Sequence, residues 1–196
     1  MEFLNATTLS YDPRSKMGEI FAEGFYSHGL NAISKDKDKL ANALAHSFIL
    51  DKFYIAVEND EVLGMAACTN GKAPIELDKK ILIQKLGFII GRIAFFALNK
   101  FMINHTYPFE ILNTTGVIEF VATAPEHRGK GVAKKLITHI MEVNQKSDYL
   151  LEVADNNDSA IRVYEKLGFI EFKRIVAPRG ANFNYLVYMR TDTKTP

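Results

Sequence analysis

The stretch that most restricts what this chain can fold into is a glycine-rich, basic turn between an apolar run and an amphipathic helix. Its sequence is APEHRGKGVAKKL, from Ala124 to Leu136. Pro125 ends the strand pattern before it, because proline cannot donate to a strand ladder. The first turn of a helix exposes unpaired N–H groups, and glycines let a bulky anion approach them. The stretch predicts a phosphate or pyrophosphate site at a strand-to-helix junction. A glycine turn with solvated lysines is the alternative that this motif alone leaves open.

The order of predicted elements indicates the fold class. Apolar positions at helical or alternating spacing predict helices at 14–28, 37–48, 131–144 and 159–167, and strands at 53–57, 62–69, 117–124, 149–153, 169–175 and 185–190. The sequence ENDE between the first two of these strands is typical of a hairpin turn. This order predicts an α/β or α+β fold around one mixed sheet flanked by helices.

One apolar segment, residues 78–104, does not fit this order of predicted helices and strands. Lys85, Arg92 and Lys100 interrupt it, so no apolar run reaches the ~20 residues that a membrane span needs. The three cations recur every seven or eight residues, which places them on one stripe of a helix. We expect an amphipathic helix or helix pair packed on the domain. A substrate lid, a dimer interface and a membrane-surface helix are the alternatives.

Composition excludes several classes of protein. The 196 residues carry a formal net charge of +1, which gives no general attraction to nucleic acid. The single cysteine, Cys68, excludes an internal disulfide and favours a reducing compartment. The first residues lack the pattern of a signal peptide, so we expect a cytoplasmic protein without a membrane partner. The five histidines and the cysteine show no metal-ligand spacing, and we expect no metal.

Two motifs carry a resemblance to a known family. A Walker A loop is absent, and the dinucleotide pattern G-x-G-x-x-G fails because Lys134 stands at its last position. What remains is R-x-x-G-x-A, which resembles the acyl-coenzyme-A signature of the GNAT N-acyltransferase superfamily. Downstream, NDSAIRVYEKLGF resembles the second signature of that family. The matching residues of the two motifs are Arg128, Gly131 and Ala133, and then Asn157, Ala160, Tyr164, Lys166, Gly168 and Phe169.

The resemblance implies a GNAT acyl-coenzyme-A N-acyltransferase fold, with a central mixed, mostly antiparallel sheet flanked by helices. It implies a single domain over residues 1–196, with an apolar helical insertion at about 71–112. Two features depart from the family pattern. The first strand, usual before the first helix, is hard to find in FLNATTLS, and the insertion is longer than the ordinary connection.

The resemblance also assigns a coenzyme site, with acetyl-coenzyme A as the cosubstrate. Backbone N–H groups of the turn would bind the pyrophosphate, and Val121 and Thr123 would pair with the pantetheine arm. Asn157 would hydrogen-bond that arm, although it could equally be a plain helix N-cap. The residues assigned to the turn are Arg128, Gly129, Lys130, Gly131, Val132 and Ala133.

Two side chains are candidates for the chemistry. The Tyr164 hydroxyl occupies the position of the family's general acid, although Tyr164 also lies on an apolar helical stripe and could be core packing. Strand alternation places Glu119 on the same face as Val121 and Thr123, with Ile118 and Phe120 on the other. There Glu119 could act as a base, orient a cationic substrate or be a solvated strand residue.

These features together predict an N-acetyltransferase. Because no G-x-S-x-G elbow and no Cys–His pairing are evident, we expect direct transfer from acetyl-coenzyme A to a primary amine in a ternary complex. The acceptor could be a small-molecule amine or a protein amine, and a homodimer is left open. The alternative of a different class is a catalytically weak acyl-coenzyme-A-binding sensor or interaction module on the same fold.

Overall fold

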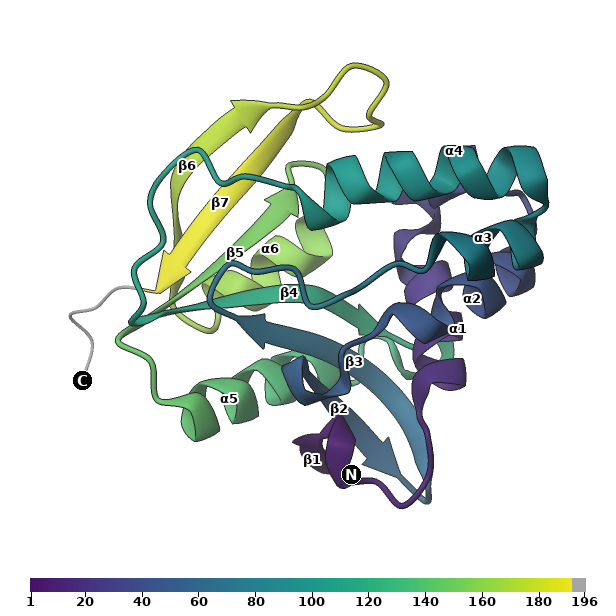
Figure 1. The fold of residues 1–196 in the computed structure, drawn as a ribbon. Helices are drawn as coiled ribbons and strands as arrows, with labels where there is room; N and C mark the ends of the chain where they lie inside the picture. The colour runs from purple at the N-terminus through teal and green to yellow at the C-terminus, as the bar shows by residue number, and fades with distance from the viewer. Residues whose placement is uncertain (192–196) are drawn as a thin grey trace.

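Seven strands form one sheet in the order β1-β2-β3-β4-β5-β7-β6 in the computed structural model, which describes residues 1–191 (Figure 1). All neighbouring strands are antiparallel except β4 and β5, which are parallel. The predicted mixed, mostly antiparallel sheet is therefore confirmed. The strands are β1 (Glu2–Asn5), β2 (Phe53–Glu58), β3 (Glu61–Thr69), β4 (Thr115–Thr123), β5 (Asp148–Ala154), β6 (Phe169–Val176) and β7 (Tyr185–Thr191).

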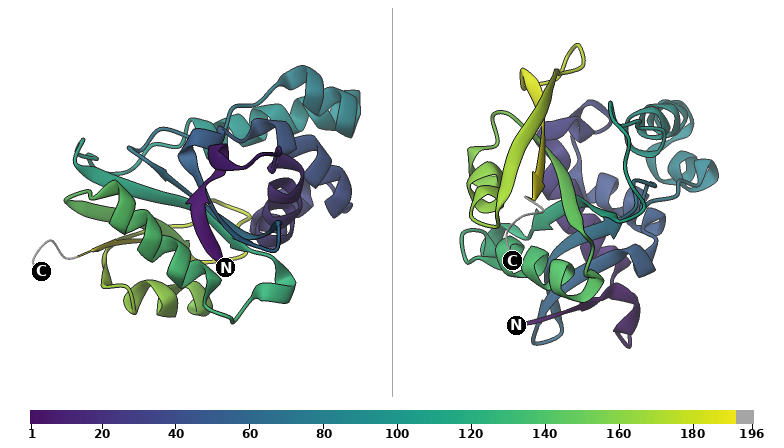
Figure 2. Two further views of the ribbon diagram at one scale, coloured as in Figure 1. Left: turned by 90° about the horizontal axis from the view of Figure 1, so that it is seen from below. Right: turned by 90° about the vertical axis from the view of Figure 1, so that its left-hand side faces the viewer.

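Helices cover both faces of this sheet (Figure 2). The N-terminal helices α1 to α4 lie on one face, and α5 and α6 lie on the other. Each helical layer encloses its own apolar cluster against the sheet, one around Phe21 and Phe53 and the other around Leu136 and Phe169. The helices are α1 (Arg14–Phe25), α2 (Lys37–Leu44), α3 (Lys79–Leu86), α4 (Phe88–Leu98), α5 (Val132–Asn144) and α6 (Asp158–Glu165).

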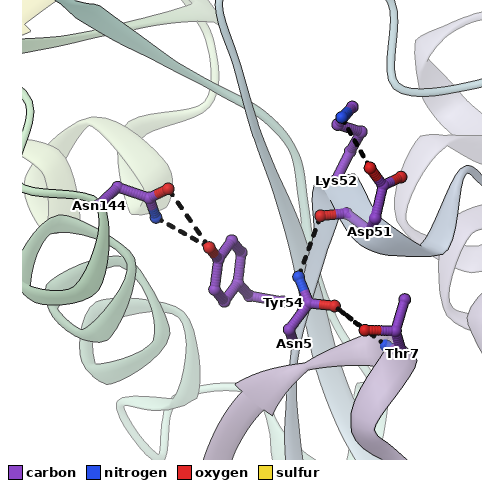
Figure 3. A network of polar contacts seen from close by, with 6 residues as sticks. All are labelled: Asn5, Thr7, Asp51, Lys52, Tyr54 and Asn144. Atoms are coloured by element: carbon purple, nitrogen blue, oxygen red, sulfur yellow. Dashed lines mark hydrogen bonds and ion pairs between the residues drawn. The ribbon is translucent and has the colours of Figure 1, made fainter.

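The first strand, which the sequence hardly shows, exists as the four-residue β1 paired with β2. A polar network fixes its end (Figure 3). The Asn5 side chain accepts a hydrogen bond from the Thr7 amide at 3.0 Å and donates one to the Asp51 carbonyl at 3.0 Å. On β2, the Tyr54 hydroxyl accepts from Asn144 Nδ2 at 3.0 Å, which ties the end of α5 to the sheet. Four residues are too few for an alternation pattern to predict a strand.

A bulge in β4 inverts the alternation that the sequence predicts. Phe120 has a φ of +52°, and the register against β3 shifts at this point. As a result Phe120 faces α1, with its ring 5.3 Å from that of Phe21, whereas Val121 joins the cluster under α5 and α6. The expectation that Glu119 shares a face with Val121 and Thr123 is therefore wrong, because the bulge inserts an extra residue between them.

The connection between β3 and β4 contains the helix pair that was one of the expectations for the apolar segment. Gly87, with a φ of +90°, separates α3 from α4, and a π-helical turn (Asn99–Ile103) follows. Lys85 therefore lies on α3 and Arg92 on α4, so the expectation of one helical stripe for the three cations is wrong. Residues 104–114 then return to β4. Among the helices of residues 1–191, none is long and apolar enough to cross a membrane.

Candidate functional site

The site lies where the two parallel strands separate. The last pair between β4 and β5 is Ile118 with Leu151, after which β4 continues to Thr123 and β5 to Ala154 without further pairing between them. We call residues 119–123 and 152–154 the fork. In the fork β4 is paired along one edge only, with β3. The other edge of β4 therefore offers backbone N–H and C=O groups to a ligand. An extended chain with amide groups is the kind of ligand that pairs with such an edge.

The glycine-rich turn follows the fork at the start of α5. Gly129 and Gly131 have φ values of +74° and +78°, a backbone conformation that favours glycine. A Cβ atom built on either residue would meet nothing within 4 Å, so neighbouring atoms do not explain the absence of a side chain. Gly131 is the N-cap residue of α5, and no side chain caps this helix. The turn therefore presents open space to uncapped N–H groups at the positive end of a helix dipole.

Neighbouring residues hold this turn in place. The Arg128 guanidinium donates to the Thr123 carbonyl at 3.2 Å, which ties the turn to the end of β4. Val132 is buried against β2 and β3, close to Gly64, where an added Cβ would come within 3.0 Å of Val132 Cγ1. Lys130 is exposed beside the turn. The residues predicted to cradle a pyrophosphate are thus gathered into one open, positively charged loop.

Asn157 lies at the start of α6, and Tyr164 lies in the last turn of this helix. The Asn157 Oδ1 accepts from the Ala160 amide at 3.2 Å, so this residue is the N-cap of α6. Its Nδ2 donates to none of the residues that the structure describes and could still donate to a ligand. Tyr164 is buried in the cluster under α5 and α6, together with Val121 and Val153 from the fork. Burial raises the pKa of Tyr164 to about 12, so the phenol keeps its proton at neutral pH.

Glu119 lies at the fork on the opposite face of the sheet. Thr69 Oγ1 donates to one carboxylate oxygen at 2.9 Å, and the Tyr107 hydroxyl donates to the other at 3.1 Å. Burial raises the pKa of Glu119 to about 7, and these two hydrogen bonds oppose the rise. The carboxylate is thus fixed in direction and exchanges its proton near neutral pH. A general base that works at neutral pH needs this combination.

A second acidic residue lies beside Glu119. Glu152 follows Leu151 as Glu119 follows Ile118, so the two carboxylates occupy equivalent places on the separating strands. His105 Nε2 lies 3.2 Å from a Glu152 oxygen, and this contact raises the pKa of His105. Tyr188, opposite Glu152 on β7, has a buried hydroxyl without a hydrogen-bond partner among residues 1–191. The fork is therefore acidic and aromatic on this face.

Sequence reasoning missed four of these residues, namely His105, Tyr107, Glu152 and Tyr188. One of them has a local signal, because Glu152 is an acidic residue inside the apolar strand sequence YLLEVA, as Glu119 is inside GVIEFVA. His105 and Tyr107 have none, because only the path of residues 104–114 across the sheet brings them to the fork. Tyr188 depends in the same way on the pairing of β5 with β7.

Cys68 and a cluster of surface residues are the other candidates for a reactive group and a metal site. Burial raises the pKa of Cys68 to about 11, so its thiol is neutral and a poor nucleophile at pH 7. Potential ligand atoms of Glu61, Glu126 and His127 lie within 4.8 Å of one another, but both glutamates are exposed. Such acidic surface groups are common without an ion, and nothing else in the described part of the chain points to a metal at this place.

The family assignment follows from comparison with known proteins. The sequence model described as the acetyltransferase (GNAT) family matches residues 17–169, which is most of the chain. The chain belongs to this family. An N-acetyltransferase from Staphylococcus aureus Mu50 has the same fold, with a TM-score of 0.64 and 17% identity over 97% of this chain and 100% of that one.

Curated relatives match over shorter segments. N-alpha-acetyltransferase 30 of Schizosaccharomyces pombe is 35% identical over 63 residues, which are 31% of this chain and 42% of the relative. The catalytic subunit of the N-terminal acetyltransferase B complex of Arabidopsis thaliana is 35% identical over 65 residues, 31% of this chain and 37% of the relative. The chain thus spans less than half the length of these relatives.

Proposed function

We propose that the protein transfers the acetyl group of acetyl-coenzyme A to a primary amine by direct attack in a ternary complex. The observation that carries this proposal is that two groups of residues reach the fork from opposite faces of the sheet. The glycine turn and Tyr164 approach it from the α5–α6 face, and the Glu119 carboxylate approaches it from the α1–α4 face. A cosubstrate on one face and an acceptor on the other could then meet where the strands separate.

The coenzyme side has the groups that a pyrophosphate and a pantetheine arm require. N–H groups from Gly129 to Ala133 would bind the pyrophosphate, since none of them is capped by a side chain. The edge of β4 that β5 leaves unpaired, at Val121 and Thr123, would pair with the amides of the arm, with the Thr123 carbonyl also accepting from Arg128. Asn157 Nδ2 would donate to the arm. When bound, acetyl-coenzyme A supplies the activated thioester.

The residues on the two faces would perform complementary proton transfers. The amine nitrogen attacks the thioester carbonyl carbon, so that a C–N bond forms and the C–S bond breaks. Glu119 accepts the proton that the amine loses, directly or through water, because its raised pKa of about 7 suits a base at neutral pH. The Tyr164 hydroxyl gives its proton to the leaving thiolate and regains one from solvent. The neutral Cys68 thiol gives no support to a covalent enzyme intermediate.

The acidic face favours an acceptor that arrives as a cation. Glu119 and Glu152 would attract an ammonium group before it loses its proton. The printed names of the matched relatives refer to N-terminal and N-alpha-acetyltransferases, so peptides with a free α-amine belong among the acceptors to be tried. We further propose that residues 71–112 are an insertion in the family fold that supplies part of this acceptor side, and that the protein acts in the cytoplasm.

The test is a thiol-release assay of the purified protein with acetyl-coenzyme A and a panel of peptide α-amines, polyamines and aminoglycosides. We expect thiol release that depends on one class of amine and falls by about 300-fold in Glu119→Gln. Binding of acetyl-coenzyme A without release from any amine would contradict the enzyme and favour the sensor. Absence of binding would contradict both functions.

A further inference from the structure

The outer face of the α3–α4 hairpin is apolar and exposed. On α4, the side chains of Phe88, Ile89 and Ile93 are 66%, 71% and 61% exposed. The opposite side of the hairpin is buried against the domain through Leu82 and Leu98. The large exposed apolar residues of this face are Phe88, Ile89, Ile90, Ile93, Phe96 and Phe101. A soluble monomer seldom exposes so many large apolar side chains together unless the patch contacts something.

The same hairpin carries a large excess of positive charge. From residue 79 to residue 109 the sequence has five cations and no Asp or Glu, namely Lys79, Lys80, Lys85, Arg92 and Lys100. None of the five forms an ion pair with any residue from 1 to 191. Several lie beside the exposed rings. Arg92 lies 5.4 Å from the centre of the Phe88 ring, and Lys100 lies 5.4 Å from that of Phe101.

We infer that this face, the outer surface of α3, α4 and the π-helical turn, docks on an anionic lipid bilayer. Apolar side chains that enter the acyl boundary and flanking cations that meet anionic headgroups are the two components of an interfacial helix. Figure 1 shows α4 as the outermost helix of its layer, so a flat surface can reach it. The inference concerns a surface away from the fork and does not depend on acetyl transfer.

Charge decides between a bilayer and a second copy of the chain. A symmetric contact through this face would bring two sets of cations together, and residues 79–109 of neither copy hold a carboxylate to separate them. An anionic bilayer satisfies the charge and the apolar side chains at once. The sequence alone favoured packing of this segment on the domain. The structure confirms that packing for its inner side only and leaves the outer side uncovered.

The experiment is co-sedimentation of the full chain with vesicles of phosphatidylcholine alone or mixed with phosphatidylglycerol, at low and high salt. We expect binding only to the vesicles that contain phosphatidylglycerol, and weaker binding at high salt because ions screen the attraction. Binding to pure phosphatidylcholine of equal strength, or no binding to either vesicle, would overturn the inference.

Two variants separate the components of the surface. The charge variant combines Lys85→Gln, Arg92→Gln and Lys100→Gln, and the apolar variant combines Phe88→Ser, Ile89→Ser and Ile93→Ser. Each cation near an anionic surface contributes a roughly fivefold to sixfold gain in affinity, so we expect the charge variant to bind about 100-fold more weakly. We expect the apolar variant to lose detectable binding. All six side chains are exposed, so thermal unfolding should stay close to that of the unchanged protein.

A matched control removes three exposed cations that lie outside the α3–α4 hairpin and outside both family motifs, as Lys35→Gln, Lys52→Gln and Lys146→Gln. This control should sediment with vesicles nearly as the unchanged protein does, whereas an equal loss would overturn the assignment to the hairpin. Concentration-dependent dimerisation that the apolar variant abolishes would instead identify a second copy as the occupant. Binding to poly-glutamate but not to vesicles would identify an acidic protein partner. In every variant the affinity for acetyl-coenzyme A should be unchanged, which separates this test from that of the proposed function.

Discussion

The two faces of the fork, the proposed coenzyme face under α5 and α6 and the proposed acceptor face under α1 to α4, are assembled in different ways. On the coenzyme face, Gly129 to Ala133 form one local turn, and Asn157 and Tyr164 lie within two turns of one helix. On the acceptor face, Thr69, Tyr107 and Glu119 come from three separate segments. The coenzyme face depends on local backbone conformation, and the acceptor face depends on tertiary packing. A relative could therefore keep the first while it changes the second.

The two faces also differ in charge and solvation. The coenzyme face is open, with positive backbone dipoles and exposed lysines around Gly131. The acceptor face is partly enclosed and acidic, and burial there raises the pKa of Glu119. If the two faces serve two substrates, a change on one face should alter one substrate's behaviour and leave the other's intact.

The largest effect is expected from Gly131→Glu. A carboxylate about 4 Å from a phosphate at an effective dielectric constant of about 20 costs about 4 kcal/mol, or roughly a 1,000-fold loss of acetyl-coenzyme A affinity. Calorimetric titration measures it. Gly180→Glu is the matched control, because Gly180 also has a positive φ, of +91°, and open space around it. An equal loss in the control would mean that backbone strain, and not a phosphate cradle, explains the result.

Next in size is the effect of Glu119→Gln on turnover. Loss of a general base should lower kcat by about 300-fold, measured by thiol release with a saturating amine. The variant should also be more stable than the unchanged protein at high pH. The folded pKa of Glu119 lies above its unfolded value, so ionisation opposes folding and the wild type loses stability as pH rises from about 4.5 through 7. A melting temperature difference that does not grow between pH 5 and pH 8 would contradict the burial of this carboxylate.

Tyr164→Phe should have a smaller effect on turnover. It removes only the hydroxyl and keeps the buried ring, so we expect a stable protein with kcat reduced by about 100-fold. Stopped-flow measurement of thiolate release would detect the loss. Phe169→Leu, a change in a ring that packs near Tyr164, tests whether altered packing of this cluster is enough to slow the reaction. Unchanged turnover in Tyr164→Phe would leave this residue with a packing role only.

The smallest effect is expected from Tyr107→Phe. Its hydroxyl stabilises the ionised form of Glu119, so its removal should raise that pKa further. The rising limb of kcat/KM against pH should move to higher pH by about half a unit to one unit, which is a roughly threefold to tenfold loss below neutrality. Tyr188→Phe, which removes a buried hydroxyl without a partner among the described residues, should leave the limb in place. Equal shifts in both variants would mean that the Tyr107 hydroxyl has no specific effect on the pKa of Glu119.

The contrast between the faces also explains how much the sequence could predict. The turn at Gly131 and the cap at Asn157 are local features, so their motifs predicted both the junction and the helix start. The helix break at Gly87 was predictable from the glycine, although the spacing of the cations suggested one continuous stripe. Placement of these residues at a coenzyme site remains a prediction, because it depends on a ligand.

The acceptor face could not be predicted because its determinants are not local. Phe120 adopts a positive φ that a residue with a side chain seldom takes, and nothing in GVIEFVA signals it. Strand alternation assigned Glu119 and Val121 to one face, and one extra residue in the strand places them on opposite faces. Tyr107 reaches Glu119 only because the connection after α4 crosses the sheet.

The most direct test of the division between the two faces is the dissociation constant of acetyl-coenzyme A for Glu119→Gln, measured by titration calorimetry beside the unchanged protein. Glu119 lies on the face opposite the glycine turn, so we predict an affinity for acetyl-coenzyme A that is the same within experimental error in a variant whose kcat is about 300-fold lower. A clearly weaker affinity in Glu119→Gln would contradict the account, because the coenzyme would then depend on the face assigned to the acceptor.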